Sequence, residues 1–176
     1  MTGDVGKLYS TALFELSREE NTFDEVHSLL NEYNDIFKDN PDFVKFLSSP
    51  GITFEEKHEV LLKVFDDDSM VFDFVCLVTE KGRISYIDRI TSEFNKLYYD
   101  RNNIAEMTVT TSTALKPELK EKLISKLEEK SGKKVRLIEK VDPDILGGLI
   151  IRYGNSEIDN SVKGKLEAVA EQLKLQ

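Results

Sequence analysis

The spacing of apolar residues changes once along this chain of 176 residues, near Ile104, and that change limits the folds it can adopt. Before this point apolar side chains recur every three or four residues, the spacing that gives a helix one buried face. In the stretch IAEMTVTTST, residues 104–113, apolar and polar side chains alternate, which is typical of a half-buried strand. The sequence therefore predicts a mainly α protein, with an N-terminal six-helix bundle over residues 1–103 and a small α/β C-terminal domain over residues 104–176.

The charge of the chain changes at the same point. Residues 1–103 hold 11 basic and 21 acidic side chains, a net charge of −10, whereas residues 104–176 hold 13 and 12, a net charge of +1. This asymmetry supports a division into two units. The net charge of −9 for the whole chain argues against nucleic acid as a partner, because binding phosphates requires a concentrated basic face.

Two of the predicted helices have unusual apolar patterns. The fifth, from Met70 to about Glu80, is apolar on nearly all sides, so we expect it to be buried at the centre of the bundle, with one strip left exposed. Its cysteine, Cys76, is expected to be a structural thiol in a reducing cytoplasm. The first helix carries one apolar stripe, formed by Val5, Leu8, Tyr9, Ala12, Leu13 and Leu16.

The second domain is expected to continue from its first strand with a helix between Pro117 and Gly132. Strands are then expected over residues 135–140 and over Leu149–Tyr153, and a final amphipathic helix follows. The apolar positions of the two helices are Leu119, Leu123 and Leu127 in the first and Val162, Leu166, Val169 and Leu173 in the last.

No group of side chains in the sequence predicts catalysis or a bound metal. His27 and His58 belong to different helices and are interpreted as surface residues, and the motifs CxxC and HExxH are missing. The acidic run at residues 66–69 has no second carboxylate cluster near it in sequence, so it is interpreted as the end of one helix and the cap of the next. We therefore expect no catalytic residue, no metal and no cofactor.

The stretch DILGGLIIRYGNSEIDNSVKGKL, residues 144–166, contains four of the nine glycines of the chain. A nucleotide-binding enzyme is the alternative that this cluster raises. A phosphate loop, however, needs its glycines between a strand and a helix and a following Lys-Ser/Thr, and Gly147-Gly148 stands before a strand with no such pair. We interpret Gly147-Gly148 as a bend or close packing at the strand start, Gly154-Asn155 as a turn, and Asp159 or Ser161 as the cap of the last helix.

The sequence also predicts no direct membrane insertion. The longest unbroken apolar run, Phe74–Val78, is far shorter than the ~18 residues that a spanning helix needs. The first residues, MTGDVGKLYS, show no basic region followed by an apolar block, so secretion is not expected.

The order of these elements resembles the delta subunit family of bacterial F-type ATP synthases, which is similar to the mitochondrial oligomycin-sensitivity-conferring protein. The most specific part is DPDILGGLIIRYGNSEIDNSVKGKL, residues 142–166, which resembles the carboxy-terminal signature of the family. Tyr9 with Ala12 and Leu13, the stretch LVTEKGRI at residues 77–84 and the strand at Ile104 support it, while Asn160 departs from a common Gly. The signature residues are Gly147, Gly148, Gly154, Asp159, Ser161, Gly164 and Leu166.

The resemblance implies a non-catalytic stator subunit that ties the catalytic head to the peripheral stalk, so that the head does not rotate with the rotor during ATP synthesis coupled to ion transport. It implies that the first and fifth helices hold the amino-terminal helix of an alpha subunit, and that the second domain engages the C-terminal ends of the stalk b subunits. The head-binding positions carried over from the family are Tyr9, Ala12, Leu13, Leu16, Phe74, Leu77 and Val78.

The resemblance further implies a peripheral protein at the cytoplasmic face of the cell membrane, present once per complex and monomeric when isolated. A generic helical adaptor module of another assembly remains the alternative, because a helical bundle with an exposed apolar strip suits many partners.

Overall fold

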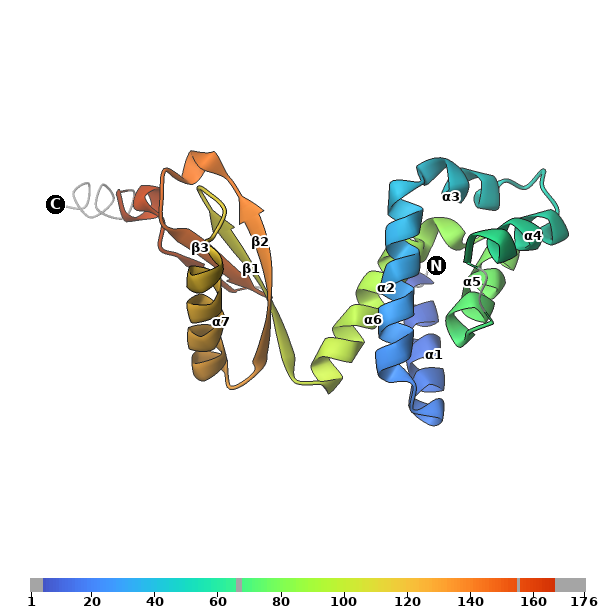
Figure 1. The fold of residues 1–176 in the computed structure, drawn as a ribbon, viewed down its shortest axis with the longest axis horizontal. Coiled ribbons are helices and arrows are strands. Elements are labelled where there is room, and N and C mark those ends of the chain that lie inside the picture. Colours follow the sequence, from blue (N-terminus) through green and yellow to red (C-terminus); the bar gives the residue numbers. More distant parts are fainter. Residues whose placement is uncertain (1–4, 66–67, 155, 167–176) are drawn as a thin grey trace. The chain divides into compact units, whose positions relative to one another are not determined.

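The computed structural model describes residues 5–65, 68–154 and 156–166, and the chain forms two compact units, residues 1–98 and residues 99–176 (Figure 1). The division falls within α6, Ile87–Arg101, a few residues before the strand that begins at Ile104. Each unit has its own hydrophobic core.

The first unit is a bundle of six helices in the described part of the chain, which confirms the predicted fold class (Figure 1). A short 3-10 helix, η1, covers Ile84–Tyr86 directly before α6. The six helices are α1 Val5–Glu20, α2 Phe23–Asp39, α3 Pro41–Ser48, α4 Phe54–Phe65, α5 Met70–Glu80 and α6 Ile87–Arg101.

The ends of these helices are set by local hydrogen bonds that the sequence predicts. The Thr53 Oγ1 accepts a hydrogen bond from the Glu56 N–H at 3.3 Å, and the Glu56 carboxylate accepts one from the Thr53 N–H at 3.0 Å, so these two residues form a capping box at the start of α4. Ser69 caps α5 by accepting from the Phe72 N–H at 3.2 Å. Gly82, with a φ of +64°, ends α5 in the left-handed conformation that favours glycine.

α5 is the centre of the core of the first unit. Val71, Val75 and Val78 are completely buried, and the cluster around them includes side chains from α1, α2, α3, α4 and α6. Asp73, Leu77 and Glu80 are exposed, and they form one row along the helix. The prediction of a buried central helix with one free strip therefore matches the structure.

α1 buries a different face from the one that its apolar pattern suggests. Its buried residues are mostly small: Gly6, Ser10, Leu13 and Ser17. A Cβ atom at Gly6 would lie 2.8 Å from Arg89 Cγ, so this glycine permits a close approach to α6. Leu8 and Leu16, which the stripe groups with the inner residues, are exposed instead, at 70% and 42%.

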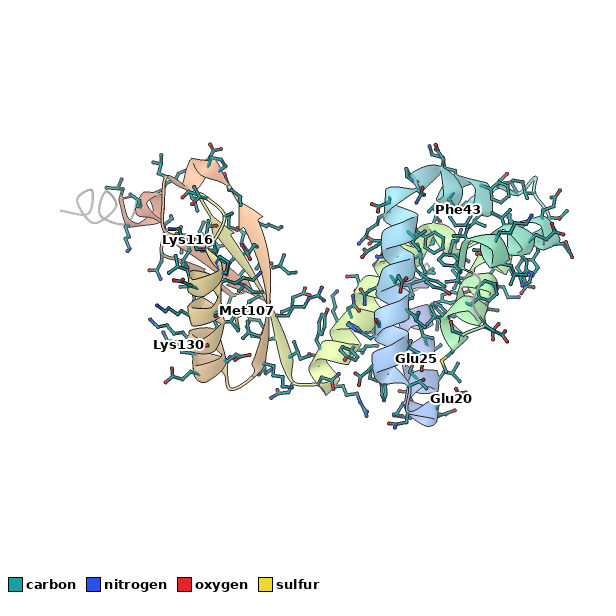
Figure 2. All side chains as sticks on the ribbon, viewed as in Figure 1. Glu20, Glu25, Phe43, Met107, Lys116 and Lys130 are labelled. Atoms are coloured by element: carbon teal, nitrogen blue, oxygen red, sulfur yellow. The ribbon has the colours of Figure 1, made fainter. Side chains whose placement is uncertain are left out.

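The second unit is a four-stranded mixed sheet with the order β2-β1-β3-β4, and α7 lies beside it (Figures 1 and 2). β1 pairs with β2 in parallel, and β3 pairs antiparallel with both β1 and β4. α7 joins the two parallel strands, as the geometry of a parallel pair requires. The elements are β1 Ile104–Thr111, α7 Pro117–Ser131, β2 Lys134–Val141, a 3-10 helix η2 at Pro143–Ile145, β3 Leu149–Tyr153 and β4 Ser156–Asp159.

The core of this unit confirms the predicted alternation in β1. Ala105, Met107, Val109 and Thr111 are buried, and Leu123 and Leu127 of α7 pack against the cluster that the three apolar members form with Ile151. Leu119, the remaining apolar position of this helix, is 53% exposed and lies in the first turn of α7.

Two further differences concern the end of the chain. The apolar pattern does not predict β4, because all four of its residues are exposed and only Ile158 is apolar. Residues 162–166 are helical, as predicted, whereas Val169 and Leu173 lie outside the described residues.

The glycine-rich stretch has a structural role that explains its composition. At Gly148, where φ is +82°, a Cβ atom would lie 2.4 Å from the backbone oxygen of Asn160. A Cβ atom at Gly164 would lie 2.5 Å from the Asp159 carboxylate. The Ser161 Oγ accepts a hydrogen bond from the Gly164 N–H at 2.9 Å, and the Asp159 carboxylate accepts one from the Ser161 N–H at 2.7 Å. The glycines thus allow β3 and the turn after β4 to pack closely.

We expect the Gly148→Ala variant to lose about 2 kcal/mol or more of unfolding free energy, because alanine is strained at positive φ and its Cβ meets backbone. Gly51→Ala is the matched control, since Gly51 is exposed and the atom nearest to a Cβ added there would be Ser49 Oγ, at 3.9 Å. Urea unfolding followed by circular dichroism measures both. Equal midpoints for the two variants would contradict the role assigned to Gly148.

A carboxylate between α2 and α6 makes the first unit sensitive to acid. The Lys38 ammonium donates to Asp88 Oδ1 at 2.9 Å and the Asn34 amide donates at 3.2 Å, and these two hydrogen bonds hold the pKa of Asp88 below its usual value. A lowered folded-state pKa contributes stability above the unfolded pKa, and this contribution is lost as the pH falls through the folded pKa. The carboxyl is largely exposed, so solvent screening limits its contribution to about 0.5–1 kcal/mol.

We therefore expect Asp88→Asn to be less stable than the unmodified chain at pH 6, and the difference to shrink as the pH is lowered toward 3. The measurement is the free energy of unfolding at a series of pH values. Asp42→Asn serves as the control, because Asp42 contacts only Lys45 of its own helix and its side chain is 92% exposed. A difference for Asp88→Asn that stays constant down to pH 3 would contradict this linkage.

Candidate partner-binding site

α1 presents a row of apolar side chains to solvent. Leu8, Ala12 and Leu16 are all exposed and stand four residues apart, so they lie one above another on one side of the helix. The two leucines are 70% and 42% exposed, and what distinguishes them from the other exposed apolar side chains is that they share one row of a helix.

α5 presents its own exposed row beside α1. The rings of Tyr9 and Phe74 meet edge to face with centroids 6.3 Å apart, so the two helices are neighbours at this level. Leu77, which is 45% exposed, stands one turn after Asp73 on the free row of α5. We refer to Leu8, Ala12, Leu16 and Leu77 as the α1–α5 strip.

The structure separates the seven predicted head-binding residues into two groups. Ala12, Leu16 and Leu77 are exposed, and Tyr9 is half-buried at the contact between the helices. Leu13, Phe74 and Val78 are 1%, 8% and 0% exposed, so they belong to the core and can only support the strip from beneath. Leu8 is not among the seven, although its spacing of four residues from Ala12 places it in the same row.

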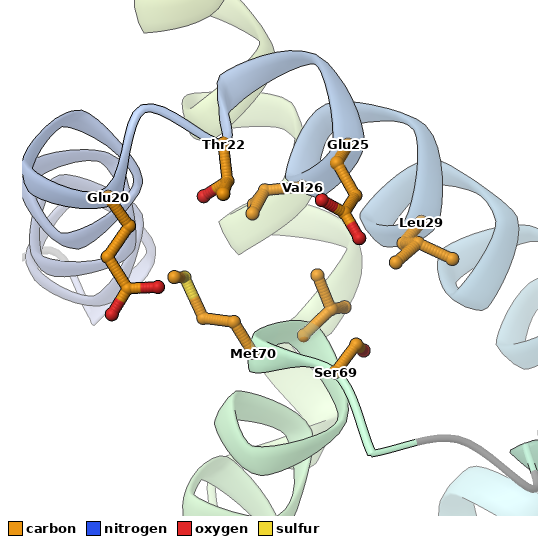
Figure 3. Close-up of a pocket in the computed structure, with 8 residues that line it drawn as sticks. Glu20, Thr22, Glu25, Val26, Leu29, Ser69 and Met70 are labelled. Carbon is orange, nitrogen blue, oxygen red and sulfur yellow. The ribbon is translucent and has the colours of Figure 1, made fainter.

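A cavity of about 150 Å³ lies where the end of α1, the start of α2 and the start of α5 meet (Figure 3). Its wall is partly apolar and partly acidic. The residues that line it are Glu20, Thr22, Glu25, Val26, Leu29, Ser69, Met70 and Val71.

The histidines and the cysteine are packed against neighbours in the described structure. The His27 ring stacks on the Tyr98 ring with centroids 3.9 Å apart, and His58 lies between Phe54 and Phe72. Both histidines are half-buried, so their description as plain surface residues is corrected. The described residues contain no group of three metal-ligating side chains, and no helix among them is long and apolar enough to cross a membrane.

The second unit also carries exposed apolar side chains, at its signature stretch. Leu146, Val162 and Leu166 are 74%, 45% and 62% exposed. The Val162 N–H donates to the Gly147 carbonyl at 3.0 Å, so the loop before β3 and the helical residues after β4 lie together. Of the signature residues, Leu166 is thus on the surface, whereas Gly148, Ser161 and Gly164 shape the backbone beneath it.

The comparisons with known proteins agree with this architecture. The model of the family described as ATP synthase delta (OSCP) subunit matches residues 5–173. A sodium-ion-specific ATP synthase subunit delta from Ilyobacter tartaricus is 36% identical, with 94% of this chain and 96% of that protein covered. The ATP synthase subunit delta of Fusobacterium nucleatum is 37% identical, with 93% and 94% covered.

A solved structure supports the fold independently. A chain in the cryo-EM structure of the Toxoplasma gondii mitochondrial ATP synthase hexamer superposes with a TM-score of 0.76, covering 97% of this chain and 98% of that one at 21% identity. At this level of identity the likeness concerns the fold alone.

The family match and these relatives therefore place the chain in a class of protein, the non-catalytic subunits of F-type ATP synthases. The chain belongs to the ATP synthase delta (OSCP) subunit family. It is a stator subunit of the peripheral stalk of an F-type ATP synthase.

The thiol of Cys76 provides a test of the packing beneath the strip. Burial first, and the nearby Asp73 carboxylate second, raise the pKa of this thiol to about 11. We therefore expect Cys76 to react slowly with a thiol reagent at pH 8 in the folded chain and fully after unfolding in guanidinium chloride. Rapid labelling of the folded chain would show that α5 is less buried than the structure indicates.

Proposed function

We propose that the chain holds the catalytic head and the stalk together through two separate junctions. The helical unit binds the amino-terminal helix of an alpha subunit, and the second unit binds the C-terminal ends of the b subunits. The observation that carries the proposal is the α1–α5 strip, because four exposed apolar side chains on two adjacent helices need a cover.

A helix is the occupant that best fits the strip. Leu8, Ala12 and Leu16 are spaced by one turn each, so an amphipathic helix laid along α1 can place its own apolar residues, also one turn apart, against them. Ala12 lies at the middle of the row, where its small side chain lets the backbone of a partner come close. Tyr9 and Phe74 support this position from below.

The charge of the helical part favours the same kind of partner. Residues 1–103 carry a net charge of −10, so a helix with basic residues is attracted to this unit. This attraction raises the rate of encounter and falls as salt is added, whereas the apolar contacts do not.

The exposed apolar group of the second unit supports the stalk junction. This group consists of Leu146 in the loop before β3 and of Val162 and Leu166 in the helical residues after β4. The glycines of the signature leave room for these segments to pack closely, and a backbone hydrogen bond joins them. We place the C-terminal ends of the b subunits against this surface. One copy of the chain, monomeric when isolated, then serves each complex at the cytoplasmic face of the membrane.

Two junctions on one chain explain the mechanical role. The rotor exerts a torque on the head, and the stalk resists it only if the connection between them is continuous. The stator subunit transmits this force without any chemical step, since its contribution is the binding free energy at both junctions.

The Ala12→Glu variant tests the head junction. A carboxylate in the middle of the strip would be buried without a partner on binding, so we expect the affinity for the purified head to fall at least 100-fold, consistent with the several kcal/mol that an uncompensated buried charge costs. Surface plasmon resonance with immobilised head measures the affinity, and circular dichroism checks that helicity is unchanged.

Ala114→Glu is the matched control, because Ala114 is exposed in the second unit and the same substitution adds the same charge. We expect it to bind the head like the unmodified chain. Unchanged binding of Ala12→Glu would remove the strip from the head junction. Failure of the tagged chain to recover alpha, beta and b subunits from solubilised membranes would instead favour an adaptor of another assembly.

A further inference from the structure

The two exposed rows of the helical unit converge on the cavity shown in Figure 3. On α1 the row continues from Leu16 to Glu20, again four residues along, and Glu20 lines the cavity. On α5 the row of Leu77 and Asp73 leads back to Met70, which also lines it. The cavity therefore lies beyond one end of the α1–α5 strip, at the next helical positions of both rows.

The wall of this cavity combines apolar surface with negative charge. Met70, Val26 and Leu29 provide the apolar part, and Glu20 and Glu25 extend carboxylates toward the cavity from α1 and α2 (Figure 3). No lysine or arginine lines it, and neither glutamate makes an ion pair within the described residues. A space of ~150 Å³ is enough for a group as large as benzene, so the end of a long side chain fits.

A third polar group belongs to the same wall. Thr22 occupies the N-cap position of α2, yet its side chain makes no capping hydrogen bond. Its Oγ1 is buried and has no hydrogen-bond partner among the described residues. An unsatisfied buried hydroxyl costs free energy, and because water does not reach this atom in the free chain, a donor brought by a ligand pairs with it only after a small shift of the Thr22 side chain.

We propose that this cavity receives the side chain of a lysine or arginine of the helix that lies on the α1–α5 strip. The aliphatic stem packs against Met70 and Val26, and the cation contacts Glu20 and Glu25 and donates to Thr22 Oγ1. One charged anchor at one end of an apolar strip sets the direction and register of the bound helix, which apolar contacts alone specify weakly. The inference rests on the proposed head junction.

The double variant Glu20→Gln/Glu25→Gln tests the charge of the cavity. We expect its affinity for the purified head at low salt to fall about 10-fold or more, with a weaker dependence on salt than the unmodified chain shows. The matched control is Glu55→Gln/Glu59→Gln, two exposed glutamates of α4 that do not line the cavity. Equal losses for both double variants would overturn the proposal, because they would reflect net charge alone.

Thr22→Val separates a role in binding from a role in folding. Because the hydroxyl has no partner in the free chain, we expect its removal to leave the melting temperature unchanged or higher while the affinity falls about 2- to 10-fold. A lower melting temperature with unchanged affinity would show that the hydroxyl serves the fold instead, and would overturn its assigned contact.

The partner residue is identified with synthetic peptides of the alpha-subunit amino terminus from the same organism, in which each Lys or Arg is replaced in turn by Met. We expect one replacement to weaken binding to the unmodified chain and to have no further effect on Glu20→Gln/Glu25→Gln. Fully additive effects at every position would overturn the proposal. If the unmodified chain binds neither head nor peptide, the proposed head junction itself is wrong. If it binds both, but no peptide replacement is coupled to the Glu20→Gln/Glu25→Gln variant, the head junction stands and the cavity does not anchor the helix.

Discussion

The burial of α5 is the constraint on which the helical unit depends. Val71, Val75 and Val78 are completely inaccessible, and side chains from the other five helices of the unit surround them. A helix with so few polar positions loses several kcal/mol if it is exposed to water, so the surrounding helices must cover nearly every side. One row of α5, formed by Asp73, Leu77 and Glu80, stays exposed, and we propose that a partner covers it.

α1 provides the second half of that surface by an unusual distribution of side chains. Its small residues, Gly6, Ser10 and Ser17, face inward and permit a close approach, whereas Leu8 and Leu16 face the solvent. The larger apolar side chains of this helix are therefore hydrated in the free chain. If the proposed head junction is right, their burial contributes to association instead of folding.

In the second unit the glycine-rich stretch serves close packing of the backbone. Gly148 and Gly164 leave no room for a side chain because the segments around them are in contact, with the Asn160 backbone at one and the Asp159 carboxylate at the other. The Asp159 hydrogen bonds to the Ser161 hydroxyl and N–H lower the pKa of this carboxyl, in keeping with a charged group that orders the start of the following helical residues. The exposed side chains of Val162 and Leu166 therefore belong to a segment whose backbone is closely packed.

The sequence by itself determined the order of the helices and strands, the helix ends and the absence of a phosphate loop, because apolar period, capping residues and glycine spacing are local properties. It did not show β4, since four exposed residues carry no hydrophobic alternation. Nor did it show that Leu13, Phe74 and Val78, carried over from the family resemblance as head-binding positions, lie in the core. Only the tertiary structure decided which face of α1 is buried, because the small side chains on that face carry almost no hydrophobic signal in the sequence. Only the tertiary structure brought Glu20, Glu25 and Thr22 to one cavity, because contacts between α1, α2 and α5 depend on how the helices pack.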